Sequence, residues 1–455
     1  MAVPEDRLVR LDEEGRPVAR AERLWCAAAA ALLVTIPVAA QQAPTAITLA
    51  EALRRTEEVT PSVVSSRGSV RSAEMAVRQA KWAFVPTITA TPQANLQMNS
   101  GQSRVDPITG AVVSGNTTNP SYGMNLSARL PLFDGFARNH SLKATRARED
   151  AADANYVTSR FQAALAVTNA FFDALANREL LQVSAAAVAR AEEQLKVATA
   201  RLRSGSGQRT DSLTALVTLG QARQNRLQAQ ANLANAEASL GRLVGVDQRV
   251  AAISDSAFYL APAALDTTAL RSEATATAPA IRSSEASVRA AQAQLRQQKA
   301  AYFPAIDLSA SSNWNAGKTN DYTLEGRRQL LIGFSVTPWT NYTRETQVEN
   351  QSIALDNAEA TLADQRRLVS AQLTQNFASL ANAQEAIEVA KSSVQASQEN
   401  VRVAEQRYKL GVMTIVELMQ IQEQLTQAEV NEIQARFTYL RTKAQIEALV
   451  GRRVP

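Results

Sequence analysis

The sequence predicts a mainly α-helical protein made of two copies of one helix-strand-strand-helix-helix unit. Residues 61–86 align without a gap with residues 279–304, and 12 of the 26 positions are identical. Further along, Leu243-Val244-Gly245 returns as Leu449-Val450-Gly451. Aromatic residues make up only 5% of the chain, a composition that favours long helices over a compact mixed core. The fixed period therefore indicates one duplicated architecture.

Residues 1–40 are interpreted as a secretory signal peptide. Basic residues as far as Arg23 precede an apolar run from Trp25 to Ala40, which ends in small residues. The run is short for a membrane span, which makes an uncleaved anchor the less favoured interpretation. Cys26, the only cysteine, lies at the start of this run, so structural disulfides are excluded and a lipid-modified N-terminal cysteine is not favoured.

After the signal peptide we expect a first structural repeat over 41–245, an equatorial linker over 246–267 and a second repeat over 268–455. The net charge of +5 is spread along the chain rather than gathered in a basic stripe, so no nucleic-acid partner is expected. His140 is the only histidine. A catalytic triad or histidine-rich metal site cannot be built from it, and we expect no enzyme activity, catalytic residue, metal or cofactor.

Each repeat changes its period after a proline, Pro86 in the first and Pro304 in the second, since proline has no N–H for the helical ladder. The segments that follow alternate apolar with small or polar residues and predict strands of about the length that crosses a membrane when tilted. These predicted strands cover residues 87–99, 121–132, 305–316 and 329–338.

The predicted strands have one apolar face and one face rich in Thr, Ser, Asn and Gln with few charges, like the wall of a water-filled lumen. A soluble sheet with one face on a core shows the same alternation and is the alternative. Four strands cannot close a barrel, and lipid does not tolerate open edges, so membrane strands would require oligomerisation. A dimer would supply eight strands and a trimer twelve. Aromatic residues cluster where strands meet helices: Phe84, Phe133, Phe136, Tyr302, Phe303, Trp339 and Tyr342.

Two series of apolar residues recur every seven positions and indicate coiled-coil packing of long helices. The first series is Val167, Ala174, Leu181, Val188, Leu195 and Leu202; the second is Leu373, Leu380, Ile387, Val394, Val401 and Tyr408. Each long helix ends at a glycine turn, Gly205 or Gly411, that lets the chain fold back as a helical hairpin.

The sequence resembles the TolC family of outer-membrane efflux channels. The motifs that carry the resemblance are AKWAFVPTI and AAYFPAI at the helix-to-strand junctions, LPLFDGFAR at 130–138, the two tip turns and the duplicated layout. The resemblance implies a trimer with a shared 12-stranded β-barrel in the outer membrane and a long α-helical coiled-coil barrel in the periplasm. It also implies passive export, contact with outer-membrane lipid, docking to a periplasmic adaptor protein and an indirect link to an inner-membrane pump.

By motif position, the resemblance makes Asp211 and Glu417 candidates for the channel entrance and its gating. The alternative for both is an ordinary first-turn acid that favours the helix dipole. The sequence departs from the family pattern at Met413 and Gln420, and TPWTNYTRE stands where a turn like PLFDGG is expected. The resemblance also assigns adaptor contacts to the tip turns, namely Ser204, Gly205, Leu410 and Gly411.

Two other classes of function stay open from the residues alone. A soluble periplasmic coiled-coil adaptor or scaffold would need the helical hairpins but has no use for four alternating strands. An envelope hydrolase is disfavoured, because no nucleophile or metal motif is present.

Overall fold

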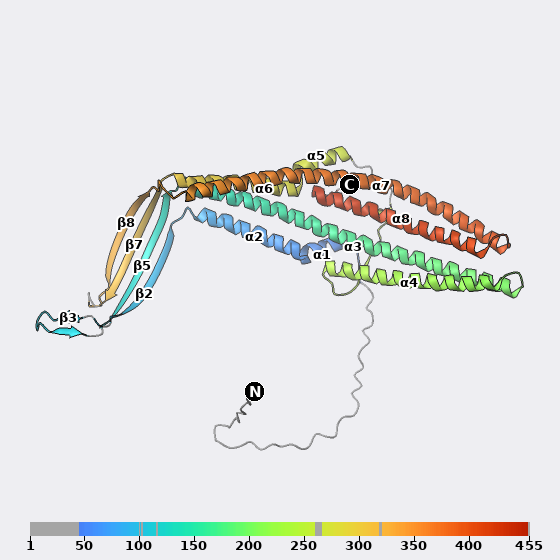
Figure 1. Cartoon of the computed structure of the whole chain (residues 1–455), viewed down its shortest axis with the longest axis horizontal. Coiled ribbons are helices and arrows are strands. Elements are labelled where there is room, and N and C mark those ends of the chain that lie inside the picture. Colours follow the sequence, from blue (N-terminus) through green and yellow to red (C-terminus); the bar gives the residue numbers. More distant parts are fainter. Residues whose placement is uncertain are drawn as a thin grey trace, which may run out of the picture. The chain divides into compact units, whose positions relative to one another are not determined.

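The computed structural model describes residues 45–99, 101, 103–114, 117–259, 266–317 and 321–453 (Figure 1). The predicted signal peptide with Cys26, and residues 260–265 of the expected linker, lie outside the described residues. The first repeat contains β1 (Thr45–Ile47), α1 (Leu49–Val59), α2 (Pro61–Trp82), β2 (Thr87–Asn99), β3 (Ser103–Val105), β4 (Val112–Ser114), β5 (Thr117–Phe133), α3 (Ala137–Arg203) and α4 (Arg209–Val244). The chain continues with β6 (Val250–Ala252), η1 (Ser256–Tyr259), α5 (Thr267–Thr277), α6 (Pro279–Lys299), η2 (Ala300–Tyr302), β7 (Ala305–Gly317), β8 (Glu325–Ser335), α7 (Thr343–Lys409) and α8 (Ile415–Val450).

The two repeats produce helices of equal length. Helices α3 and α7 have 67 residues each, and α4 and α8 have 36 each. At 1.5 Å per residue, α3 and α7 are each about 100 Å long. All six members of the second heptad series are buried, as are Val167, Ala174 and Val188 of the first. Coiled-coil packing predicted from the seven-residue spacing is therefore present within a single protomer.

None of the helices in the described part of the chain is both long and apolar enough to cross a membrane.

A cluster of buried apolar residues surrounds the middle of α3. Phe172 lies edge-to-face with Phe171 and with Phe258 of η1, and its ring centroid is 6.0 Å from that of Phe437 in α8. Strands β1 and β6 pair in parallel and contribute Ile47 to the same cluster. The segment expected to be an equatorial linker thus packs partway along the long helices, which explains why it contains a short strand.

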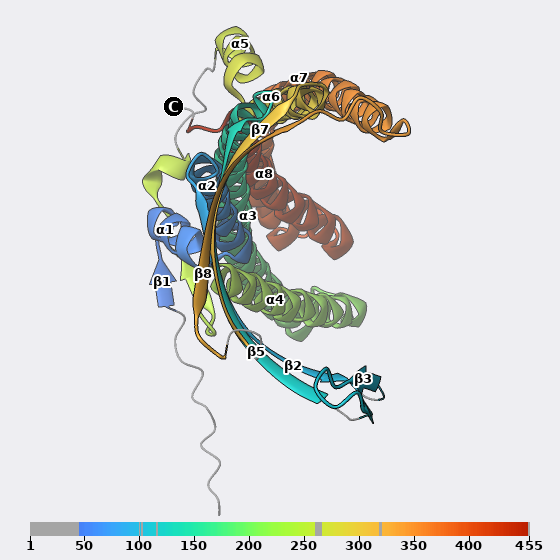
Figure 2. The same cartoon turned by 90° about the vertical axis from the view of Figure 1, so that its left-hand side faces the viewer.

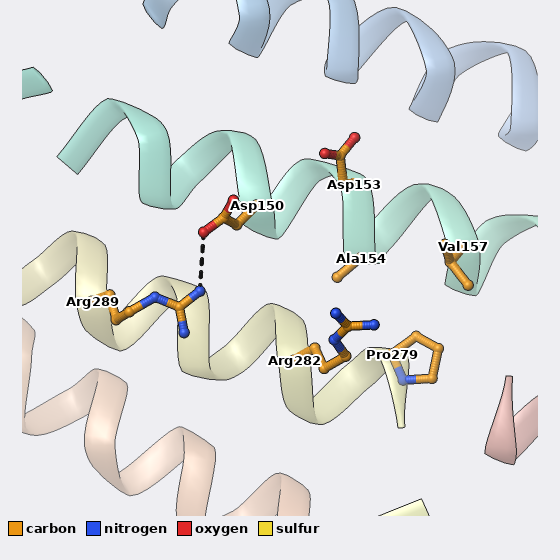
Figure 3. A pocket seen from close by; sticks show the side chains of 7 residues that line it. All are labelled: Asp150, Asp153, Ala154, Val157, Pro279, Arg282 and Arg289. Carbon is orange, nitrogen blue, oxygen red and sulfur yellow. Dashed lines mark hydrogen bonds and ion pairs between the residues drawn. The ribbon is translucent and has the colours of Figure 1, made fainter. Parts of the chain in front are cut away.

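The repeats also meet between α3 and α6, where a cavity of about 340 Å³ is lined by charged side chains (Figure 3). Arg289 of α6 forms an ion pair with Asp150 of α3 at 3.1 Å, and Arg282 and Asp153 also line the cavity. Exposed pairs of this kind contribute little free energy, so this contact orients the two helices rather than holding them together.

The four long strands form one antiparallel sheet in the order β2-β5-β7-β8, which bends along its length (Figure 2). The β5–β7 pairing joins the first repeat to the second, with Ala128 opposite Ala310. A register shift between Pro131 and Phe133 marks a bulge near the helices. Strands β2 and β8 are the two edges, so both repeats contribute one open edge.

The register separates the side chains into two faces, here called the apolar face and the polar face. The apolar face carries Ile88, Ala90, Pro92, Ala94, Leu96, Met98, Tyr122, Met124, Leu126, Ala128, Leu130, Ile306, Leu308, Ala310, Ser312, Trp314, Ala316, Gly326, Arg328, Leu330, Ile332 and Phe334. The polar face carries Thr, Ser, Asn and Gln together with an ion pair of 3.1 Å between Arg129 and Asp307. The alternation read from the sequence therefore aligns across all four strands.

Some boundaries differ from those expected. Strand β8 covers Glu325–Ser335 rather than 329–338, because the chain turns before Pro338 towards the start of α7. Strand β5 extends from Thr117 to Phe133, a little beyond the expected 121–132 at both ends. The connection between β2 and β5 contains the hairpin of β3 and β4, closed by a turn in which the Gly110 N–H donates to the Asp106 carbonyl at 2.9 Å.

Candidate functional site

The candidate entrance lies at the tips of the helical hairpins α3–α4 and α7–α8. Gly205 and Gly411 have φ values of +75° and +80°, a left-handed conformation that favours glycine. The N–H of Ser206 donates to the Arg201 carbonyl and that of Val412 donates to the Arg407 carbonyl, each at 3.0 Å. These bonds satisfy the last carbonyl groups of α3 and α7, so the tip turns are well-formed helix caps.

Glu417 has a defined structural contact in the first turn of α8. Its carboxylate accepts from the Thr414 N–H at 2.9 Å, while the Thr414 hydroxyl accepts from the Glu417 N–H at 3.3 Å. The two bonds form a capping box. The Thr414 backbone N–H and then its hydroxyl hold the pKa of Glu417 below its usual range, with a smaller contribution from Arg407. Glu417 is therefore exposed and ionised, and its carboxylate caps the N-terminus of its own helix.

Asp211 occupies the equivalent turn of α4 without a capping box. The N-cap residue is Gln208, whose side chain makes no capping bond, and Asp211 is half-buried. The pKa of the Tyr408 phenol is raised, first by burial and second by the negative charge of Asp211. The charge of Asp211 therefore acts on a residue of the second hairpin. The structure therefore shows different contacts for Asp211 and Glu417, which the sequence had placed in equivalent turns.

Arg201 and Tyr408 connect the two tips, and neither was a predicted site residue. Arg201 donates from Nη1 to the Tyr408 carbonyl at 2.8 Å, and its guanidinium carbon lies 5.0 Å from the Tyr408 ring centroid. A second bond, from Nη2, reaches the Ser206 carbonyl at 3.3 Å. Tyr408 was identified only as the last member of a heptad series. The signal that was missed is a buried tyrosine that ends an otherwise aliphatic series beside an arginine in the equivalent turn.

A cavity of about 290 Å³ adjoins this contact, between α3, α7 and α8. Gln194 and Tyr408 line it, and within the described residues the Gln194 amide and the Tyr408 hydroxyl are buried without a hydrogen-bond partner. Unpaired buried polar groups cost free energy and are uncommon in well-packed regions. The interior of the tip therefore contains buried polar groups that the described contacts leave unpaired.

The predicted junction residues Pro86 and Pro304 lie one residue before β2 and β7, at the equivalent elbows of the two repeats. At the first elbow Arg138 lies 5.0 Å from the ring centroid of Phe84, and at the second Arg344 lies 4.1 Å from that of Tyr302. These equivalent contacts join the first turn of each long helix to the segment that enters the sheet.

The two elbows share a backbone conformation although their sequences differ. Gly135 has a φ of +65° and its counterpart Asn341 a φ of +49°, and the residue after each is also left-handed. A Cβ at Gly135 would lie 2.6 Å from the Ala300 carbonyl oxygen, so a side chain does not fit there. Asparagine tolerates this region better than most residues, which explains how TPWTNYTRE replaces the expected glycine turn.

Six of the seven predicted junction aromatics are strongly exposed at these elbows, as an interfacial belt requires. Their exposed fractions range from 45% for Phe84 to 78% for Trp339.

A sheet with one exposed apolar face, joined to paired helical hairpins, defines the class of duplicated envelope channel proteins. The family model described as "Outer membrane efflux protein" matches residues 52–246 and 270–452, and the chain belongs to this family. Protein CyaE of Bordetella pertussis is 24% identical over 83% of this chain and 78% of its own length. Outer membrane efflux protein BepC of Brucella suis is also 24% identical, over 90% of this chain and 86% of its own length.

The crystal structure of the outer-membrane protein VceC from Vibrio cholerae has the same fold. It superposes with a TM-score of 0.74 at 14% identity, and the match covers 89% of this chain and 96% of VceC. The expected mainly α-helical fold with a sheet portion is thereby confirmed.

Membership of the family establishes the main functional expectations. The protein is an outer-membrane channel for efflux or secretion and a passive transporter rather than an enzyme. The soluble adaptor or scaffold is not favoured.

Proposed function

We propose that three copies of this chain form one outer-membrane exit duct, with twelve strands in a shared barrel and the helices in a periplasmic tunnel. The observation that carries the proposal is the exposure of the apolar face in a single protomer. Ile88, Leu330 and Ile332 have exposed fractions of 70%, 71% and 66%. An apolar surface of this size needs lipid or protein to cover it. Lipid fits because the face spans all four strands.

The open edges of the sheet support oligomerisation. In lipid the unpaired N–H and C=O groups of β2 and β8 have no water to bind, so β8 of one copy must pair with β2 of the next. Two copies give eight strands, whose interior is just filled by side chains, whereas three give twelve and leave space for a channel. Transport through the barrel therefore favours the trimer.

The internal repeat predicts the register of this seam. Ile88 pairs with Ala128, and the residues 218 and 206 positions later, Ile306 and Phe334, pair in the same way. The β5–β7 contact, with Ala128 opposite Ala310, is the internal equivalent of the seam. Adding 206 to Ala128 gives Phe334, and subtracting 218 from Ala310 gives Pro92. The predicted seam therefore places Phe334 opposite Pro92 of the next protomer.

Disulfide cross-linking tests both the seam and its register. In a Cys26→Ser background, Leu331→Cys and Asn95→Cys fall opposite each other across the predicted seam, on the polar face. We expect oxidation of this double variant to give covalently linked protomers on denaturing gels. The matched control pairs Leu331→Cys with Thr91→Cys, about 13 Å away along the same face, because four residues of strand span that distance. Linkage of the control alone would overturn the register.

Native mass spectrometry of the detergent-extracted protein from the outer-membrane fraction tests the subunit number. A trimeric mass supports the shared barrel. A monomer or dimer as the largest species would contradict it.

We also propose that the tip turns, with Ser204, Gly205, Leu410 and Gly411, dock a periplasmic adaptor that links the duct to an inner-membrane pump. Leu410 and Val412 have exposed fractions of 80% and 64% at the tip. A photoreactive residue at position 410 should cross-link a periplasmic protein in cells, whereas one at Val389, equally apolar but about 30 Å from the end of α7, should not. Equal cross-linking at both positions would contradict docking at the tip.

At the entrance, we propose that Asp211 attracts cations towards the duct. Its half-buried position beside the Arg201–Tyr408 contact supports this role, while the capping box of Glu417 supports a mainly structural role for that residue.

A further inference from the structure

Among the residues that the structure describes, Arg328 is the single charged residue on the apolar face of the four-stranded sheet. The register places it opposite Ser312, with Gly326 and Leu330 as the nearest positions on the same face of β8. Its side chain is exposed, and within the described residues it forms no ion pair or hydrogen bond. The inference drawn from this placement rests on the proposed barrel, in which the apolar face contacts lipid.

An unpaired guanidinium on a lipid-facing strand is unfavourable. Arginine in such a position costs roughly 2 to 4 kcal/mol at the bilayer midplane and little near the interfaces. Arg328 lies six residues from Phe334, the last apolar-face residue of β8 on the helical side, which is about 20 Å along the strand. On a tilted strand this corresponds to about 15 Å of an apolar band that is about 25 Å tall, so Arg328 lies in the outer half.

The next protomer offers Arg328 no carboxylate at the seam. The predicted register puts Met98 of the next protomer opposite Arg328, with Leu96 beside it. Every apolar-face residue of β2 is neutral: Ile88, Ala90, Pro92, Ala94, Leu96 and Met98. The nearest acid on the same strand, Glu325, belongs to the polar face. The counterion must therefore come from the loops or from the membrane.

The surroundings favour the membrane. Trp314 of β7 lies across Gly326, where a Cβ would be 3.0 Å from the indole ring, on the side of Arg328 nearer the external loop. Tryptophan is enriched at membrane interfaces, and long arginine side chains extend towards the headgroups. The helices extend on the periplasmic side, so this end of β8 faces the exterior and the outer leaflet.

We infer that Arg328 binds a phosphate group of an anionic outer-leaflet lipid at each seam between protomers. A guanidinium forms two parallel hydrogen bonds with a phosphate, and the pairing removes the unfavourable isolated charge. The bound lipid would cover the seam from outside, giving three equivalent sites in the trimer. Arg327, the adjacent residue on the polar face, has the same charge but no access to lipid.

Native mass spectrometry of the trimer with added bisphosphoryl lipid A tests this inference. We expect Arg328→Gln to bind this lipid about tenfold more weakly than the unmodified protein, because a charge-assisted bidentate contact is lost. Arg327→Gln, with the same loss of charge on the other face, should bind as the unmodified protein does. Equal binding by Arg328→Gln and the unmodified protein would overturn the inference.

Two further comparisons separate this site from its alternatives. A lipid of the same acyl composition without phosphate should bind all three proteins equally weakly, and a selective loss with Arg328→Gln would show that phosphate is not recognised. If Asp321 of the external loop were the counterion instead, Arg328→Gln would leave lipid binding unchanged and Asp321→Asn would strengthen it by freeing the guanidinium, and that pair of results would contradict the proposal. The Leu331–Asn95 cross-link is measured in the Arg328→Gln background, so failure of the barrel is distinguished from loss of the lipid site.

Discussion

Arg201 and Tyr408 join the tip of the first hairpin to the tip of the second, through a hydrogen bond of 2.8 Å to the Tyr408 carbonyl and a guanidinium stacked on the phenol ring. The two residues belong to equivalent turns of the two repeats, yet their roles differ: one donates and the other accepts. The contact holds the two hairpins together at the end where the duct meets the periplasm.

Replacing Arg201 with alanine should loosen the tip. Removing a charge-assisted hydrogen bond and a cation–π contact weakens the local structure by about 1 to 3 kcal/mol. Hydrogen exchange of the amides in residues 404–412 should become faster, as followed by mass spectrometry. The control is Arg203→Ala, which removes an exposed arginine two residues away. Equal acceleration in both variants would show that the Arg201 contact does not hold the tip.

Asp211 should influence ion passage more than Glu417 does, because the capping box already occupies the Glu417 carboxylate. In planar bilayers, Asp211→Asn is expected to lower the preference for cations, with a smaller change for Glu417→Gln. The double variant with alanine at both positions should differ most from the unmodified channel. Unchanged conductance and selectivity in all three would assign both acids to a purely structural role in the first turns of their helices.

The capping box predicts a pH dependence at the α8 tip. The folded-state pKa of Glu417 is depressed, so its contribution to stability is present above the ordinary carboxylic pKa and is lost as the pH falls through the lower folded value. Hydrogen exchange in residues 414–420 should therefore accelerate below about pH 4. Thr414→Ala should weaken the cap by about 1 kcal/mol at neutral pH. Exchange that is independent of pH in this window would contradict the cap.

A charge on the apolar face should prevent assembly. Leu126→Arg or Leu308→Arg places an arginine where lipid contact is expected, at a cost of roughly 2 to 4 kcal/mol per site near the midplane. Both variants should yield little trimer in the outer-membrane fraction. Asn125→Arg adds the same charge on the polar face and should assemble normally. Normal amounts of trimer for all three variants would contradict the assignment of the faces.

The elbow arginines should stabilise the connection between helices and sheet. Arg344→Ala removes the stacking on Tyr302 and the bond from Nη1 to the Thr337 carbonyl at 3.1 Å. We expect a loss of about 1 to 3 kcal/mol, seen as a lower melting temperature of the detergent-solubilised protein. Arg138→Ala should have a similar effect at the first elbow, and Arg148→Ala, an exposed site on α3, serves as the control. If the melting temperature of Arg148→Ala fell as much as those of the elbow variants, the elbow arginines would have no special role in stabilising the connection.

The sequence predicted the parts of the fold that depend on local periodicity. Alternation along β2 and β7 was enough to assign their faces, because a strand places every second residue on the same side. The heptad series located the buried stripe of α7, because residues seven positions apart lie on the same side of a coiled-coil helix. The start of β8 was missed because Glu325, Arg327 and Arg328 interrupt the apolar pattern, although backbone pairing with β7 continues through them.

The site was predicted less completely. Motif position placed Asp211 and Glu417 in the tip turns, but only the three-dimensional contacts distinguish a capped carboxylate from one whose charge reaches the second hairpin. The link between Arg201 and Tyr408 joins residues more than two hundred positions apart, and no local pattern specifies such a pair. Its prediction would have required the relative rotation of two coiled coils.

The pairing of β5 with β7 suggests how the chain arose and what duplication made possible. A protein with one repeat would need six copies, and six identical seams between molecules, to supply twelve strands. Fusion of two repeats turns every second seam into an internal one that forms without an encounter between chains. It also frees the two halves to diverge, as Gly135 and Asn341 or Asp211 and Glu417 have done. Sixfold symmetry would have forbidden such specialisation.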